Sequence, residues 1–260
     1  MNLKTLAIIG SNGMVGSDLV KYLTSNFELT QIDRDNYNDY KGKEFDIVIN
    51  ANGNSNKIWS NENRLGDFEA STVSVYKTLL DFPCKKYIYI SSVDVYENHS
   101  SEKTTSETES INPSNLAPYG FHKFLSECII KNLAGDYIIL RCPMMLGTNL
   151  KKGPIYDILK NSRLFVSGSS AFQMITTKEL AEIILSLLKK DVSKEIFNVG
   201  GKGKIELNDI GKYIKKEIDF QKNSETQIYE TDISKLSKIF PLKNSEEYLK
   251  DFLKEDILRV

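Results

Sequence analysis

The sequence has few of the residues that build disulfide frameworks or metal centres. It holds 3 cysteines and 2 histidines among its 260 residues. Cys84, Cys128 and Cys142 show no paired spacing, so we expect buried free thiols in a reducing compartment. The two histidines, His99 and His122, do not form a convincing zinc-ligand set with these cysteines. The sequence therefore predicts no metal site.

A long hydrophobic run and an excess of charge of one sign are also lacking. The longest apolar runs, such as residues 6–9 and 138–140, have strand length, whereas a membrane span needs about 20 apolar residues. The run near the N-terminus stops at Gly10, which is too short for a signal-peptide core. The formal net charge is -1 and there is no basic block, so neither a membrane nor a nucleic-acid partner is expected. We expect a cytoplasmic protein.

The sequence does contain a regular alternation of short apolar runs with helical patterns. This alternation predicts βαβ units, in which parallel strands form one buried sheet. The predicted strands cover residues 6–9, 28–32, 45–49, 86–90, 137–140 and 196–199. The predicted helices cover residues 14–23, 68–80, 118–133, 155–159, 176–190, 207–218 and 246–257. The polar stretch 97–115 is expected to be a long loop that is functional or mobile.

Three glycines mark the turn after the first predicted strand. Gly10, Gly13 and Gly16 stand at even spacing between this strand and the following helix. The backbone of such a turn must approach a pyrophosphate closely, and a side chain would block that approach. The free N–H groups at the start of the helix would then face the phosphates. The spacing therefore predicts a dinucleotide-binding turn.

The second predicted strand is followed by Asp33. A carboxylate in this position accepts hydrogen bonds from the adenosine ribose hydroxyls and repels a 2′-phosphate, which favours NAD over NADP. The neighbouring Arg34 keeps NADP open as the alternative, because a guanidinium there can pair with that phosphate.

Tyr119 and Lys123 are four residues apart in a predicted helix, so they lie on one helix face. A free tyrosine has a pKa of about 10 and is a poor base near neutral pH. A nearby ammonium favours the phenolate, so we expect Lys123 to lower the pKa of Tyr119. Ser92 follows the fourth predicted strand and would hydrogen-bond the same substrate oxygen as Tyr119. This set predicts that Tyr119 exchanges a proton with a carbonyl or carbinol while hydride moves.

With these features the chain resembles the extended short-chain dehydrogenases/reductases, the NAD-dependent epimerase/dehydratase family, over nearly its whole length. The resemblance is carried by Gly10, Gly13, Gly16 and Asp33, by the stretches 91–96 and 118–123, by Arg141 and Gly147, and by the stretches 179–181 and 197–201. By this likeness Ser92, Tyr119 and Lys123 take the catalytic places. The cofactor-binding set is then Gly10, Asn12, Gly13, Met14, Val15, Gly16, Asp33, Arg34, Ala51, Asn52, Gly53, Ser91, Tyr119, Lys123 and Pro143.

The family implies an α/β Rossmann fold, a doubly wound parallel sheet with a small C-terminal cap that binds the substrate. We expect the NAD(P)-binding Rossmann domain to span residues 1–147, with residues 174–200 returning to it. Residues 148–173 and 201–260 would form the substrate-binding cap.

The substrate half departs from the pattern of sugar-nucleotide epimerases in this family. Met144 stands where they carry an asparagine, and residues 171–174 lack the arginine that faces the substrate diphosphate. Both differences weaken the expected diphosphate contact, because a buried phosphate needs donors. The cations that remain as substitutes are Lys151, Lys152 and Arg163.

Dehydratases of the family place two acidic residues after the catalytic serine or threonine, and here these positions hold Val93 and Asp94. The absence of the first acid disfavours 4,6-dehydration, and Asp94 is expected to brace the loop. What remains resembles a reductase of 4-keto sugars, of the dTDP-4-dehydrorhamnose reductase type.

We therefore expect an NAD(P)-dependent oxidoreductase that reduces a keto group of a sugar or sugar nucleotide. Two alternatives stay open, namely an NAD-dependent C4 epimerase of nucleotide sugars and a non-catalytic dinucleotide-binding sensor. The sequence also leaves open whether the protein forms a homodimer.

Overall fold

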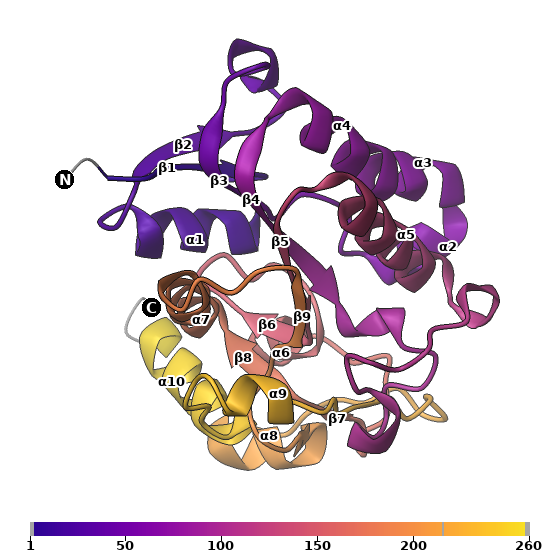
Figure 1. The fold of residues 1–260 in the computed structure, drawn as a ribbon. Coiled ribbons are helices and arrows are strands. Elements are labelled where there is room, and N and C mark those ends of the chain that lie inside the picture. Colours follow the sequence, from indigo (N-terminus) through magenta and orange to yellow (C-terminus); the bar gives the residue numbers. More distant parts are fainter. Residues whose placement is uncertain (1–2, 215, 258–260) are drawn as a thin grey trace.

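The computed structural model describes residues 3–214 and 216–257, and its main feature is a parallel six-stranded sheet (Figure 1). The strand order is β2-β1-β3-β4-β5-β9, and all neighbouring strands are parallel. The order reverses direction between β1 and β3, which is the doubly wound arrangement predicted from the sequence. The strands are β1 (Thr5–Ile9), β2 (Glu28–Ile32), β3 (Phe45–Asn50), β4 (Cys84–Ser92), β5 (Tyr137–Cys142) and β9 (Glu195–Asn198).

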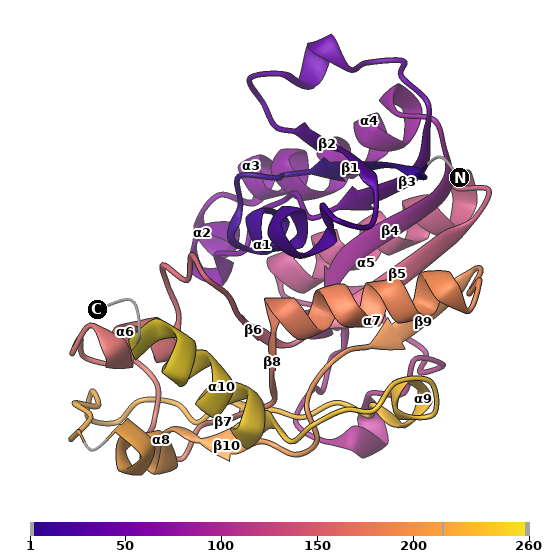
Figure 2. The same cartoon turned by 90° about the vertical axis from the view of Figure 1, so that its left-hand side faces the viewer.

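Helices cover both faces of this sheet (Figures 1 and 2). One face carries α1 (Met14–Leu23) and α7 (Thr177–Lys189), which pack against each other. The opposite face carries α4 (Ser74–Asp81) and α5 (Pro118–Leu133). Three shorter elements precede α4 and lie beside α5: α2 (Lys57–Glu62), α3 (Arg64–Phe68) and the π-helical turn η2 (Glu69–Val73).

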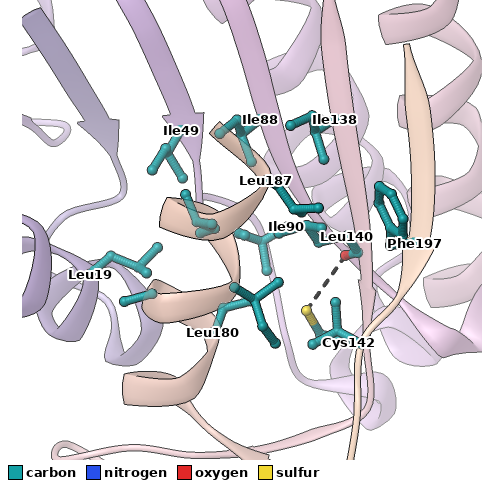
Figure 3. Packing of buried hydrophobic residues seen from close by; sticks show 14 of the residues in the cluster. Leu19, Ile49, Ile88, Ile90, Ile138, Leu140, Cys142, Leu180, Leu187 and Phe197 are labelled. Carbon is teal, nitrogen blue, oxygen red and sulfur yellow. Dashed lines mark hydrogen bonds between the residues drawn. The ribbon is translucent and has the colours of Figure 1, made fainter. Parts of the chain in front are cut away.

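The core follows from the alternation of side chains along the strands, which point in turn to opposite faces of the sheet. In β1, Leu6 and Ile8 join the cluster under α1 and α7, whereas Ala7 belongs to the cluster on the other face. Figure 3 shows the first cluster, in which Leu19 of α1 and Leu187 of α7 meet the strand residues. Because both faces are buried, the strands read as continuous apolar runs in the sequence.

After β5 the chain leaves the sheet and builds a smaller body beyond the carboxyl ends of the strands (Figure 1). This C-terminal cap has its own hydrophobic cluster, while α7 and β9 return to the large sheet. Its strands are β6 (Met144–Leu146), which pairs with β8 (Met174–Thr176), and β7 (Ala171–Phe172), β10 (Ile205–Glu206) and β11 (Ile228–Tyr229), which pair in the order β10-β7-β11. Its helices are α6 (Pro154–Leu159), α8 (Leu207–Ile214) and α10 (Ser245–Ile257), whereas α9 (Ser234–Ser237) packs against β9 of the large sheet.

Two predicted helices have different bounds in the structure. The helix predicted over residues 68–80 begins earlier, because the Asn63 side chain accepts a hydrogen bond from Gly66 N–H at 3.1 Å and starts α3 there. The helix predicted over residues 207–218 ends at Ile214. Lys216 N–H instead donates to Gly211 O at 3.1 Å, and residues 216–219 have no regular secondary structure, while residue 215 lies outside the described residues.

The expectation of three buried thiols is wrong for one cysteine. Cys142 is buried and Cys84 is half-buried, but Cys128 is exposed. The inner face of α5 is occupied by Glu127 and Ile130, so that Cys128 points to solvent. Within the described part of the chain, no helix is both long and apolar enough to cross a membrane.

Candidate active site

The carboxyl edge of the large sheet gathers residues that are far apart in the sequence. In doubly wound sheets a ligand binds beyond this edge, at the point where the winding direction reverses. Gly10 follows β1, Asp33 follows β2 and Ala51 follows β3. Ser92 ends β4, and Pro143 follows β5. The predicted site residues therefore meet along one edge of the sheet.

The chain packs too closely at Gly10 and Gly16, in the turn after β1 and the first turn of α1, to leave room for a side chain. Gly10 has a φ of +79°, a conformation that residues with a Cβ rarely adopt. A Cβ on Gly16 would lie 2.0 Å from the carbonyl oxygen of Gly10. The N–H of Gly13 donates to this same oxygen at 3.1 Å. The side chains that follow in the first turn of α1, Met14 and Val15, are half-buried.

Asp33 is tied to this glycine turn by hydrogen bonds. Its Oδ2 accepts from the Ser11 hydroxyl and from the N–H of Asn12, the latter at 3.0 Å. Arg34 is exposed beside it. The structure therefore fixes one negative charge next to the turn, at the end of β2.

The segment after β3 lies between the glycine turn and α5. The Asn52 amide donates to the Ser74 hydroxyl at 2.5 Å, and Asn52 N–H donates to Asn50 Oδ1 at 2.9 Å. A Cβ built on Gly53 would lie 3.6 Å from Lys123 Nζ, which places this segment directly over Lys123.

Tyr119 and Lys123 lie one turn apart near the start of α5, as their spacing predicts. Tyr119 is half-buried, whereas Lys123 is only 5% exposed. Lys123 Nζ donates to Ile90 O at 3.2 Å and lies 4.9 Å from the ring centre of Tyr89. No carboxylate pairs with Lys123 among the residues that the structure describes, so its positive charge is available to a neighbouring anion.

The pKa of Tyr119 differs from the sequence-based expectation. Burial of the phenol raises its pKa above the ordinary value and is the largest influence. The Lys123 charge acts in the predicted direction and lowers the pKa, and Lys57 and the hydrogen bond with Ser92 add to this, while Asp94 raises it. The net effect is a pKa above the ordinary value of a tyrosine, opposite to the lowering expected from Lys123 alone.

The two serines at the end of β4 point to different partners. Ser91 Oγ donates to Glu127 Oε1 at 2.6 Å, so this hydroxyl faces α5 rather than the edge of the sheet. Ser92 Oγ donates to Asp94 Oδ2 at 2.8 Å and also lies beside Tyr119. Of the two hydroxyls, Ser92 is thus the one at the reacting end of the site.

Arg141, one of the residues that carry the family resemblance, lies in a buried hydrogen-bond network. Its guanidinium is buried and makes two hydrogen bonds to Glu127, at 3.1 and 2.7 Å, and one to the Tyr96 hydroxyl at 2.8 Å. Tyr96 in turn donates to Asn198 Oδ1 at 2.8 Å. This network joins α5, β5 and β9 behind the site.

Sequence reasoning missed a charged cluster beside Tyr119. Lys57 Nζ lies 2.5 Å from Asp94 Oδ1 and donates to the Tyr229 hydroxyl at 2.8 Å. The Tyr229 hydroxyl also donates to Asp94 Oδ1, at 3.1 Å. We call Lys57, Asp94 and Tyr229 the charged clamp, because it links α2, the 3₁₀ turn η3 (Val93–Val95) and β11 of the cap.

The charged clamp keeps both of its ions charged at neutral pH. Burial acts against ionisation of Asp94, but the Lys57 charge and the hydrogen bonds from Lys57 and Ser92 hold the pKa of Asp94 below its usual value. Burial likewise disfavours the Lys57 ammonium, but Asp94 and Tyr229 raise the pKa of Lys57 above its usual range. An ionised carboxylate therefore stands next to Ser92.

On the cap side of the site, position 144 and positions 171–174 carry no cation. The Gln173 side chain is fully buried and bonds the backbone of Gly201 and Thr231, so it holds the cap together. Met144 is half-buried in the cap cluster. Arg163 is exposed and pairs with Asp219 at 2.8 Å. The other two candidates, Lys151 and Lys152, are exposed.

The residues at the sheet edge fit a dinucleotide by shape and charge. A pyrophosphate needs a turn without side chains and free N–H groups at a helix start, which Gly10, Gly16 and the start of α1 supply. A ribose needs an acceptor, which Asp33 supplies, and a nicotinamide ribose needs donors, which Lys123 supplies.

Comparison with known proteins agrees with this geometry. The chain matches the model of the NAD dependent epimerase/dehydratase family over residues 6–200. An uncharacterized protein of Methanocaldococcus jannaschii is 24% identical over an alignment of 315 positions, which covers 97% of this chain and 96% of that protein.

Solved structures of similar fold include both a reductase and an epimerase. The dTDP-4-dehydrorhamnose reductase of Bacillus anthracis, in complex with NADP, has a TM-score of 0.82 at 15% identity and covers 97% of this chain and 99% of its own. The UDP-glucuronic acid 4-epimerase of Bacillus cereus, in complex with UDP-glucuronic acid and NAD, has a TM-score of 0.75 at 18% identity and covers 96% and 99%. At 15% and 18% identity, the similarity to these two structures establishes the fold alone.

Proposed function

The chain belongs to the NAD dependent epimerase/dehydratase family, and we propose that it is an NAD(P)-dependent oxidoreductase that reduces a keto group of a nucleotide-activated sugar. The observation that carries this proposal is the placement of Tyr119 at the carboxyl edge of the sheet, beside the Ser92 hydroxyl and one helix turn before the buried Lys123. Reduction of a carbonyl consumes a proton at the oxygen, so a neutral phenol is the form that the reaction needs.

The proposed proton step uses Tyr119 and Lys123. A bound nicotinamide dinucleotide would supply the hydride that adds to the carbonyl carbon. Tyr119 donates its hydroxyl proton to the carbonyl oxygen, so its O–H bond breaks as the O–H bond of the product alcohol forms. Lys123, buried one helix turn away, stabilises the phenolate that remains. Tyr119 then recovers a proton from solvent.

The proposed substrate class is supported by the family and by the similar enzymes. The two similar structures named above are a dTDP-4-dehydrorhamnose reductase and a UDP-glucuronic acid 4-epimerase. The reductase is favoured over the epimerase because Met144 and residues 171–174 lack the asparagine and the arginine that epimerases of the family carry there.

A stoichiometry assay separates the two reactions. With dTDP-4-dehydrorhamnose as substrate, we expect one NADH to be oxidised for each carbonyl reduced, followed by absorbance at 340 nm. With UDP-glucuronic acid and catalytic NAD, we expect no epimer. Formation of an epimer without net use of NADH would replace the reductase by the epimerase. Binding of NADH without turnover of any keto sugar would favour a sensor.

The cofactor preference gives a separate prediction. We expect NADH to bind at least about tenfold more tightly than NADPH, because Asp33 repels a 2′-phosphate, and tenfold corresponds to about 1.4 kcal/mol. Asp33→Ala should reduce the ratio of the two dissociation constants to about threefold or less, measured by fluorescence titration. The exposed Asp39→Ala variant serves as the control and should keep the parent ratio. Tighter binding of NADPH by the parent would contradict this account of Asp33.

A further inference from the structure

The charged clamp controls the only proton that Ser92 can donate. A serine hydroxyl has one donor hydrogen and two acceptor lone pairs. The hydrogen of Ser92 is directed to Asp94 Oδ2 at 2.8 Å, and Asp94 N–H returns a bond to Ser92 Oγ at 3.2 Å. While Asp94 is ionised, Ser92 can therefore offer only a lone pair to a third group.

The clamp is packed against the helix that carries Tyr119. A Cβ on Gly120 would lie 2.0 Å from the carbonyl oxygen of Asp94, so the η3 turn and α5 touch at this glycine. Lys57 Nζ lies 6.0 Å from the centre of the Tyr119 ring. Both ions of the clamp thus stand close enough to Tyr119 to affect its proton.

The cap holds the third member of the clamp in a fixed position. The Tyr229 ring is stacked between His99, at 3.9 Å between ring centres, and Phe172, at 5.5 Å. Lys57 Nζ also lies 4.4 Å from the centre of the Tyr229 ring. The Tyr229 hydroxyl is therefore a rigid partner for both ions, supplied from the cap to the Rossmann half.

We propose that Lys57 and Asp94 are positioning residues for the Tyr119 proton: Asp94 takes the hydrogen of Ser92, so that Ser92 is no donor to the substrate oxygen, and Lys57 with Tyr229 holds Asp94 in place beside Tyr119. This inference rests on the proposed function of Tyr119 as the proton donor. The single hydrogen of Tyr119 then remains for the substrate carbonyl, which receives its hydrogen bond from Tyr119 alone.

The two ions act on the Tyr119 proton with opposite sign. A carboxylate disfavours the phenolate and raises the pKa of Tyr119, whereas an ammonium favours the phenolate and lowers it. The titratable groups around Tyr119 are Lys123 on α5, Asp94 in η3, Lys57 on α2 and Tyr229 on β11, with His99 stacked on Tyr229. Neutralising Lys57 or Asp94 separately should therefore shift the pKa of Tyr119 in opposite directions if the two charges act on its proton. A clamp that only stabilises the fold gives no such pair of shifts.

The test is a titration of residue 119 without substrate. Tyr119 is replaced by 3-fluorotyrosine, whose fluorine gives one ¹⁹F NMR signal and lowers the pKa of the phenol into a milder pH range. Asp94→Asn should lower the pKa of this phenol, and Lys57→Met should raise it, each by on the order of one unit. Lys57→Arg keeps the charge and should leave the pKa within about 0.3 units of the parent.

Folding of each variant is checked by its thermal unfolding midpoint, and Lys57→Gln replaces Lys57→Met if that variant does not fold.

Opposite shifts for the two neutral variants support the positioning role. Shifts of the same sign, or no shift in either variant, overturn it, because a clamp that only braces the fold has no reason to affect the phenol in opposite directions. The titration needs no turnover. A failure of the proposed reaction would show instead in the Tyr119→Phe assay and leave this result standing.

Discussion

Replacing Tyr119 by phenylalanine is expected to lower the rate of carbonyl reduction by about 10²- to 10⁴-fold, the usual contribution of a positioned general acid. The change removes only the hydroxyl and keeps the half-buried ring at this position of α5, so the fold should remain intact. The dissociation constant of NADH should change by less than about threefold, because Lys123 and the glycine turn keep their contacts. Turnover with dTDP-4-dehydrorhamnose and NADH titration measure the two quantities.

A matched control for this variant is Tyr76→Phe. Tyr76 is 45% exposed on α4, away from the sheet edge, so its hydroxyl has no part in the proposed step. Turnover of this control should equal that of the parent. Turnover of Tyr119→Phe within about threefold of the parent would remove Tyr119 from the mechanism.

Replacing Arg141 by methionine is expected to lower the free energy of unfolding by about 3–5 kcal/mol. Arg141 and Glu127 are both buried and joined by two hydrogen bonds, so the variant leaves the Glu127 carboxylate without its cation. The Tyr96 hydroxyl loses an interaction as well. Urea unfolding monitored by circular dichroism measures the loss.

The controls for this prediction use an exposed pair and a double variant. Arg163→Met breaks the pair with Asp219, whose side chains are 61% and 58% exposed, and should cost only about 0–1 kcal/mol. The double variant Arg141→Met with Glu127→Leu should regain part of the loss, because no buried charge remains unpaired. A loss below about 1 kcal/mol for Arg141→Met alone would contradict the structural role assigned to this pair.

Strong local signals made part of the fold predictable from the sequence. The helix over residues 118–133 was predicted at its observed bounds because Pro118 marks a first-turn position. The strand over residues 28–32 was likewise correct. The helix α2 had no such signal, since Ile58 is 70% exposed and the helix has no apolar stripe; it begins where the Asn56 side chain accepts from Trp59 N–H.

The candidate site was predictable where motif residues follow strand ends, and unpredictable where distant segments meet. The parallel topology alone brings Gly10, Asp33 and Ser92 to one edge. The charged clamp joins Lys57 to Asp94 across 37 positions and to Tyr229 across 172 positions. No spacing rule links such residues, because Tyr229 is placed by the pairing of β11 with β7 inside the cap. The raised pKa of Tyr119 has the same origin, since burial is a property of the assembled fold.

The most direct test of the central claim, that Tyr119 protonates a carbonyl as hydride arrives, follows the hydride itself. The enzyme is given dTDP-4-dehydrorhamnose and NADH that carries deuterium at both C4 positions, and the sugar product is analysed by mass spectrometry and NMR. The proposed reduction predicts one deuterium on the former carbonyl carbon for each NADH oxidised. A product without deuterium, formed while NADH is unchanged, would contradict the account.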